Sequence, residues 1–217
     1  MYPIAFALDY ESEGRNRLTT LLRYIVAIPW EIVAALWGIG AMVVTFIAWF
    51  ALLFTGRYPD GMYDFNAKYL RMTTRVNGFL YLGSDEWPPF HGDADDNYPV
   101  RVGVGPPKAE YSRMKVLFRI IVGIPVYLLA IVQSLIISVV ALIAWFVILF
   151  TGKFPQGLYE ALRGGLAYVT RASAYFLLMT EDYPPFSYDE SVEQPQLAAG
   201  GGGAAVGATS EQQQPGA

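Results

Sequence analysis

The chain has 217 residues, of which 54% are hydrophobic and only 16% are charged, and its net charge at neutral pH is −4. Soluble domains carry about 25% charged residues, so this composition indicates a membrane protein rather than a soluble protein with a rich core. The small net charge argues against nucleic-acid binding. The absence of cysteine excludes disulfides and thiolate ligands, and the single histidine, His91, argues against an imidazole metal site or a histidine-dependent triad.

An internal repeat organises nearly the whole chain. Tyr2-Pro3 recurs as Tyr98-Pro99, an offset of 96 residues (99 − 3), and the same offset relates the later motifs without a gap. This predicts two copies of one structural unit related by a pseudo-twofold axis, too long and too few for a solenoid. The predicted organisation is a membrane unit at 1–92, an acidic linker at 93–97, a second membrane unit at 98–190 and a disordered tail at 191–217.

Each copy opens on alternating apolar residues, the two-residue period of a β-strand. These residues are Ile4, Phe6 and Leu8 in the first copy and Val100, Val102 and Val104 in the second. Because a lone strand is not stable in water, we expect the two strands to pair with each other and so to join the repeats.

Each copy then has an apolar span of 31 residues (54 − 24 + 1), covering 24–54 in the first and 120–150 in the second, with Glu31 as the one charged residue. As one straight helix such a span would be about 46 Å long, against a hydrocarbon core of about 30 Å, and would need a tilt of about 50°. Basic residues flank both ends of both spans. The positive-inside rule therefore favours both ends of each span on the cytoplasmic side.

We therefore predict a kinked, membrane-inserted helical hairpin in each copy, with the turn at Trp37-Gly38-Ile39-Gly40 in the first. One alternative is a single long, kinked and tilted helix per copy. Another is that these small residues only pack at a helix contact. Pro29 and Pro125 lie early in the spans, where proline kinks or restarts a helix, which suggests a short interfacial helix that turns into the membrane.

A Thr-Gly-x-x-Pro-x-Gly-x-Tyr motif after each span predicts a helix end, a turn and a new helix. In the first copy this new helix is amphipathic and basic, which suits either the headgroup region of a membrane or packing on its own bundle. The second copy is less charged and contains Gly164-Gly165, so we expect it to pack more closely against protein. An acidic pair and two prolines then give an extended exit in both copies.

Four motifs of the repeat unit are distinctive: Tyr2-Pro3-Ile4, Arg23 to Pro29, Ala48 to Pro59 and Pro88 to Phe90, each repeated 96 residues later. In these motifs the chain resembles a family of bacterial, largely actinobacterial, membrane proteins known as domain of unknown function 4389. The resemblance covers nearly everything except the tail. It implies an integral membrane location and supplies no catalytic residue.

Seven residues are candidates for a functional role. Glu31 is the one acid within a span, and intramembrane acids often mark ion or proton paths, although its counterpart Tyr127 is a residue typical of the membrane interface. Arg23 and Arg119 precede the spans. The acidic pairs could act as acid and base or hold a cation if they converged, but acidic loops are also common. The members of these pairs are Asp85, Glu86, Glu181 and Asp182.

The expected fold is mainly α and integral to the membrane, with two tandem repeats that each contain a short strand, a kinked hairpin and an interfacial amphipathic helix. The expected function is that of a non-enzymatic scaffold or accessory subunit of a cell-envelope or transport complex in the bacterial plasma membrane. We expect a multi-pass topology with cytoplasmic termini, and no catalytic, cofactor or metal site. The expected partners are the lipid bilayer and other membrane subunits. Alternatives are a carrier of lipid or other hydrophobic cargo, a membrane-shaping hairpin protein, and an enzyme built from the acidic pairs.

Overall fold

The computed structural model describes residues 2–185, which form seven helices and two strands in two equivalent sets. The first set is β1 (Ile4–Leu8), α1 (Arg17–Val26), α2 (Ile28–Thr55) and α3 (Asp60–Leu80). The second set is β2 (Val100–Val104), α4 (Arg113–Leu117), α5 (Arg119–Val122), α6 (Ile124–Thr151) and α7 (Gln156–Phe176). The predicted disordered tail at 191–217 lies outside the described residues.

A pseudo-twofold axis relates the two sets. Strands β1 and β2 pair antiparallel, with Phe6 opposite Val102 at the centre of the ribbon, which confirms the predicted strand pairing. On the same axis the hydroxyl oxygens of Thr74 in α3 and Thr170 in α7 lie 3.3 Å apart, and these two residues are 96 positions apart in the sequence. The axis therefore passes through the middle of the sheet and through the contact between α3 and α7.

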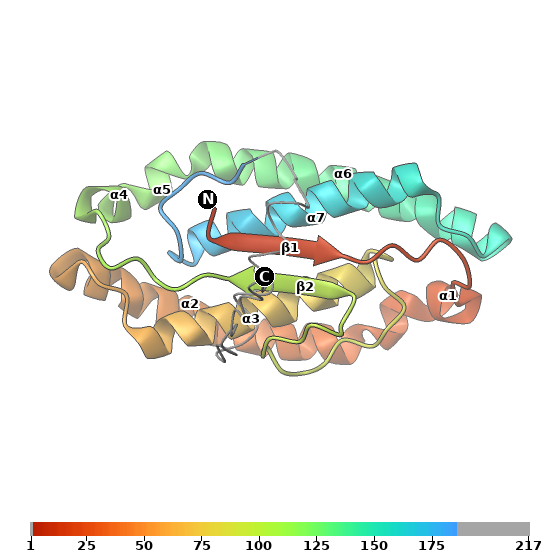
Figure 1. Cartoon of the computed structure of the whole chain (residues 1–217), viewed down its shortest axis with the longest axis horizontal. Coiled ribbons are helices and arrows are strands. Elements are labelled where there is room, and N and C mark those ends of the chain that lie inside the picture. Colours follow the sequence, from red (N-terminus) through yellow and green to blue (C-terminus); the bar gives the residue numbers. More distant parts are fainter. Residues whose placement is uncertain (1, 186–217) are drawn as a thin grey trace, which may run out of the picture.

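The elements form three layers, with the sheet on one side, α3 and α7 beneath it, and the long helices α2 and α6 along the outer edges (Figure 1). Each repeat packs on the other: α3 lies against β2, α7 against β1, α1 against α6, and α4 against α2. Two tryptophans add hydrogen bonds between the repeats. Trp49 donates to the carbonyl of Val116 (3.0 Å), and Trp145 donates to that of Thr20 (2.9 Å). Neither repeat therefore completes its core alone.

The predicted hairpins are wrong, because α2 and α6 are continuous helices of 28 residues each. The proposed turn lies in the middle of α2, where its glycines make room for α3: a Cβ at Gly38 would meet the Tyr69 hydroxyl at 3.0 Å, and one at Gly40 would meet the Phe65 ring at 3.2 Å. The packing alternative is thus confirmed for these glycines. The first 31-residue span is instead divided at Ala27, so that its first residues end α1 and the rest form α2.

The two prolines start the long helices rather than kink them. Pro29 and Pro125 lie in the first turn of α2 and α6, where proline has no intrahelical hydrogen bond to lose. The chain bends just before them, at Ala27 and Gly123, so the expected short helix before each span is present. Each long helix stops at a glycine with a left-handed backbone, at Gly56 (φ 71°) and Gly152 (φ 72°).

Helices α3 and α7 are central rather than peripheral. Both are sandwiched between the sheet and the long helices, and many of their side chains are buried, so the prediction of packing within the bundle is confirmed. The expected closer packing of the second copy is also confirmed. A Cβ at Gly165 would lie 2.5 Å from Ile137 of α6, whereas one at Gly164 would point into open space.

Candidate functional site

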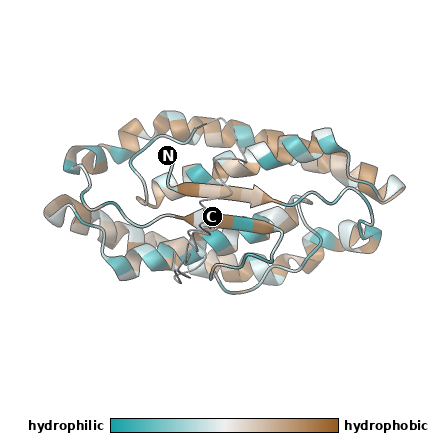
Figure 2. Cartoon of the chain, in the orientation of Figure 1, coloured by the Kyte–Doolittle hydropathy of each residue, from teal (hydrophilic) through white to brown (hydrophobic). Residues whose placement is uncertain are grey.

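The outer sides of α2 and α6 form a broad apolar surface, which we call the apolar face. Large side chains are strongly exposed along both helices, and hydrophobic residues dominate their length (Figure 2). Among the most exposed are Leu36, Ile39, Met42, Phe46 and Phe54 on α2, and Leu135, Val139, Leu142 and Phe150 on α6, at 57–75%. Both helices are long and apolar enough to cross a membrane, and only 11% and 28% of their most apolar windows are buried. A core helix of a soluble protein would be mostly buried.

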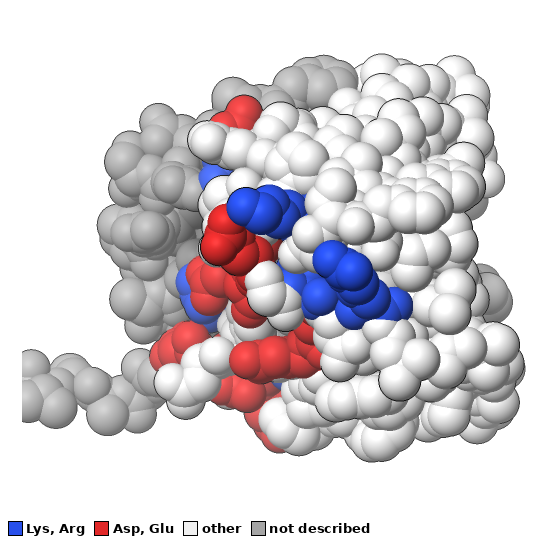
Figure 3. All heavy atoms as spheres, turned by 90° about the vertical axis from the view of Figure 1, so that its right-hand side faces the viewer, with Lys and Arg blue, Asp and Glu red and all other residues white. Residues whose placement is uncertain are grey.

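Charge is separated from the apolar face across the short dimension of the molecule. Seen from one end, acidic and basic side chains gather towards the sheet, and the side formed by the long helices is free of them (Figure 3). Midway along α3, Lys68 pairs with Asp64 (3.2 Å) and Asp93 (3.5 Å) on the sheet side. The next residue, Tyr69, contacts Gly38 near the middle of α2. These charges therefore lie level with the centre of the long helix.

A buried arginine closes the end of α3. The Arg23 guanidinium donates hydrogen bonds to the carbonyls of Phe79 and Ser84 (2.7 Å to Ser84), forms an ion pair with Asp85, and lies 4.5 Å from the centre of the Phe79 ring. It therefore satisfies the free carbonyls of a helix end, just before Leu82 turns left-handed (φ 68°). Burial lowers the pKa of Arg23 to about 10, partly offset by Asp85, so the side chain stays charged at neutral pH.

We call such a buried arginine, bonded to the carbonyls at a helix end, an arginine clamp. The second copy has the same clamp, but the acid beside it pairs with a lysine instead of with the arginine. Arg119 donates hydrogen bonds to the carbonyls of Tyr175 (3.1 Å from Nε) and Thr180, and its guanidinium lies 3.3 Å from the centre of the Tyr175 ring. Burial lowers the pKa of Arg119. The acid at the equivalent position, Glu181, pairs with Lys108 (3.6 Å) and accepts a hydrogen bond from the Ser112 amide (2.6 Å).

The structure places the four predicted acids at two separate sites, one in each repeat. Asp85 pairs with Arg23 of its clamp, whereas Glu181 (3.6 Å) and Asp182 (3.3 Å) both pair with Lys108. Glu86 uses its backbone, which accepts a hydrogen bond from Tyr98 (3.0 Å). The two pairs do not converge. Within residues 2–185, no cluster of three or more histidine, aspartate and glutamate residues could hold a metal ion.

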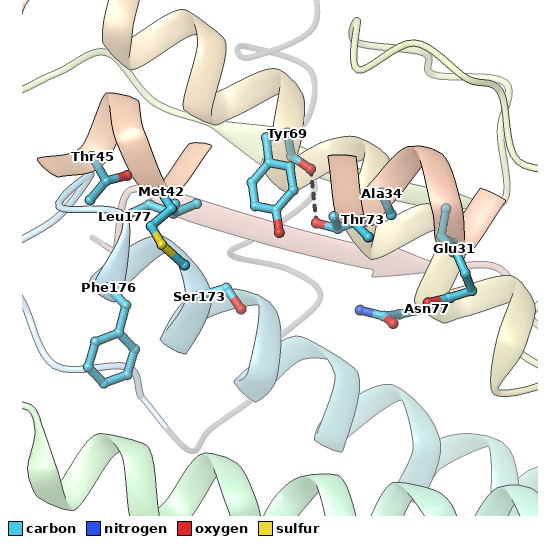
Figure 4. Close-up of a pocket in the computed structure, with 12 residues that line it drawn as sticks. Glu31, Ala34, Met42, Thr45, Tyr69, Thr73, Asn77, Ser173, Phe176 and Leu177 are labelled. Carbon is cyan, nitrogen blue, oxygen red and sulfur yellow. Dashed lines mark hydrogen bonds between the residues drawn. The ribbon is translucent and has the colours of Figure 1, made fainter. Parts of the chain in front are cut away.

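Glu31 lies at one end of an open groove of about 610 Å³ between α2, α3 and α7. Figure 4 looks onto this groove with the sheet behind it, and shows Tyr69 and Ser173 pointing inward between Glu31 and Asn77 at one end and Met42 at the other. The side chains of Glu31, Tyr69 and Asn77 make no hydrogen bond or ion pair within the described part of the chain. Burial raises the pKa of Tyr69, so its hydroxyl remains a hydrogen-bond donor.

The groove continues into a second, more apolar hollow of about 320 Å³ along α2. Met42, Thr45 and Phe176 line both hollows, so the two are sections of one groove. The second section is walled mainly by apolar side chains, among them Phe46 and Trp49. It also reaches Arg119, whose guanidinium is bonded to the carbonyls of Tyr175 and Thr180.

A difference between the repeats explains why the polar section lies beside α2. Tyr69 stands between α2 and α3, with its hydroxyl against Gly38. The equivalent residue of the second copy is Gly165, which allows α7 to close directly onto Ile137 of α6. The sequence analysis had singled out Glu31 but missed Tyr69, Asn77 and Ser173. We call Tyr69 the wedge, because it holds α2 and α3 apart. The signal that could have identified it was the replacement of this tyrosine by a glycine at the matching position of the second copy.

Comparison with known proteins gives one result. The family model described as domain of unknown function DUF4389 matches residues 17–91 and 113–187, the helical parts of the two repeats. No curated protein and no solved structure matched the chain. The two matches together span more than half of the chain and reproduce its duplication. The chain therefore belongs to the DUF4389 family, with two tandem copies of the domain.

Proposed function

We propose that this protein is a non-enzymatic membrane protein that lies flat in one leaflet of the bacterial plasma membrane and serves there as a scaffold or accessory subunit. The observation that carries the proposal is the separation of charge from the apolar face across the short axis of the molecule. Exposed apolar surfaces of this extent are favourable only against lipid or another protein.

Charged residues lie halfway along the molecule, and this position favours long helices that lie flat in the membrane over long helices that cross it. If α2 crossed the bilayer, Asp64, Lys68 and Asp93 would lie near mid-depth, where each charged group is costly. The two-stranded sheet would lie at the same depth with two open edges, which hydrocarbon does not tolerate. In the flat orientation the sheet and these charges face water, and only α2 and α6 enter the acyl region.

The flat orientation also accounts for the basic flanks of both spans. Exposed cations stand near the ends of the long helices, with Arg17 and Lys153 at one end of the molecule and Arg57 and Arg113 at the other. All four would then lie on a single membrane surface, where anionic headgroups attract them. This replaces the multi-pass expectation and keeps the two ends of each span on the same side. We place the termini on that side, in the cytoplasm.

The role as a scaffold rests on what the polar side chains do. Three of the four acids that were candidates for acid–base chemistry form ion pairs, Asp85 with Arg23 and both Glu181 and Asp182 with Lys108, and the arginines of the clamps hold helix ends. A rigid, interlocked body with one face in lipid leaves the sheet side and the ends available to partner subunits. Purification in a mild detergent followed by mass spectrometry should recover stoichiometric partners, and recovery of the chain alone would contradict this role.

Membrane depth tests the orientation directly, because the chain has no native cysteine. Ile32, Ile39 and Phe46 are seven residues apart on the exposed side of α2. Nitroxide labels on single cysteines at these positions, in vesicles of phosphatidylethanolamine and phosphatidylglycerol, should report one common depth by electron paramagnetic resonance. A crossing helix would separate the outer two labels by about 21 Å in depth, and that result would reject the proposal.

Labels on the opposite side of the molecule are the matched control. Cysteines at Asp64 and Lys68 should be accessible to water-soluble paramagnetic reagents in the same vesicles. Protection of both by the bilayer would also contradict the flat orientation.

A further inference from the structure

We propose that the groove beside α2 binds a single lipid whose headgroup is hydrogen-bonding but not anionic, with monoacylglycerol as the model compound. This deepens the proposed function, since the groove would take its ligand from the leaflet in which α2 lies. The polar section would hold the headgroup, and the second section would hold the acyl chain.

The polar section is suited to a neutral headgroup by the chemistry of its lining. It offers a carboxylate from Glu31, a phenol from Tyr69 and an amide from Asn77, none of which has a hydrogen bond or ion pair within residues 2–185. These groups can accept from and donate to the hydroxyls of a polyol. No lysine or arginine lines this section among the described residues, and Glu31 would repel a phosphate or carboxylate headgroup.

The size and shape of the groove fit one amphiphile. The polar section of about 610 Å³ lies within the range of small-molecule sites, about 300–1,000 Å³. From Glu31 to Trp49 the groove follows 18 residues of α2 (49 − 31), or about 27 Å. That length exceeds the acyl depth of one leaflet, about 15 Å, so it accommodates a headgroup and one chain lying along the helix.

The duplication supplies the variant and its control. Ala35 lines the polar section, and its counterpart Ile131 is a partly exposed residue of α6 that does not line it. Ala35→Trp should fill the groove, whereas Ile131→Trp places the same indole side chain at the equivalent position of the other repeat. Tyr69→Phe removes only the phenol oxygen and keeps the wedge, so it tests the headgroup contact without closing or opening the groove.

The experiment is native mass spectrometry of the full chain in mild detergent with added 1-monooleoylglycerol or oleate at equal concentrations. We expect one monooleoylglycerol per chain and much weaker retention of oleate. Tyr69→Phe should weaken monooleoylglycerol binding by about threefold to tenfold, the effect of one hydrogen bond. Ala35→Trp should weaken it by more than tenfold, and Ile131→Trp should leave it unchanged.

Four outcomes would overturn the inference: no retention of monooleoylglycerol, equal retention of oleate, unchanged binding in Ala35→Trp, or equal losses in Ala35→Trp and Ile131→Trp. The depth measurement on α2 separates this result from the proposed orientation. Uniform depths with no retained monooleoylglycerol would reject the groove alone. Depths that differ along α2 would reject the flat orientation, whatever the ligand result.

Discussion

The two repeats share a backbone plan but differ in how the long helix meets the helix beneath it. Both have a strand, a 28-residue apolar helix and a 21-residue helix whose end is clamped by a buried arginine. In the first repeat Tyr69 stands between the two helices, and in the second Gly165 brings them into contact. The residues that the two repeats share therefore determine their helices, strands and clamps. The residues that differ between them, Tyr69 and Gly165, determine where the groove opens.

The arginine clamps provide the largest expected effect. Arg23→Ala should lower the free energy of unfolding by about 3 kcal/mol or more, because Asp85 loses one of its two buried arginine partners and is left with the longer pair to Arg15 (3.3 Å), and two carbonyls lose their donor. Arg119→Ala should cost less, about 2 kcal/mol, because Arg119 is hydrogen-bonded to the neutral carbonyls of Tyr175 and Thr180, while Glu181 pairs with Lys108 instead. Denaturant unfolding in detergent measures both, with Arg57→Ala as the exposed control. If Arg119→Ala proved the costlier change, the ion pair with Asp85 would not be what distinguishes the clamps.

The two adjacent glycines of α7 provide an intermediate effect and a control for each other. Gly165→Ala should destabilise the fold by about 1–3 kcal/mol, because the new methyl group would meet Ile137. Gly164→Ala has open space and should stabilise the helix by up to about 1 kcal/mol. Thermal unfolding of the two variants side by side tests this. Equal responses would show that α6 and α7 do not pack as closely as the wedge comparison requires.

The threonine pair on the pseudo-twofold axis should give the smallest effect. Thr74→Val leaves Thr170 without its partner and should cost about 1 kcal/mol. The double change Thr74→Val and Thr170→Val should cost less than the sum of the two single changes, since it removes both polar groups together. A double-mutant cycle measured by denaturant unfolding checks this. Strict additivity would indicate that the two hydroxyls do not interact.

Local patterns predicted the parts of this fold that depend on near neighbours. The alternating residues around Phe6 and Val102 predicted two strands, and the instability of a lone strand predicted that they pair. The motif that begins at Thr55-Gly56 predicted where the first long helix stops. The apolar spans predicted surfaces suited to a membrane, although their uniform hydrophobicity gave no sign of which side faces lipid.

The candidate site could be predicted only in part, for a physical reason. Arg23 and Asp85 were singled out, but their pairing joins residues 62 positions apart and depends on how α1 meets the end of α3. Glu31 was singled out as an unusual charge. The groove around it was not foreseen, because it is made by α7 of the other repeat as well as by α2 and α3.

The sequence by itself determined the duplication, the strands, the helix ends and the membrane-like composition, since each is set by residues close together in the chain. Only the tertiary structure decided that each span contains one continuous helix of 28 residues, that each repeat packs against elements of the other, and that Tyr69 opens a groove on one side. Those features depend on contacts between distant segments. An apolar stretch of 28 residues is compatible with a hairpin or with one continuous helix until its neighbours are placed.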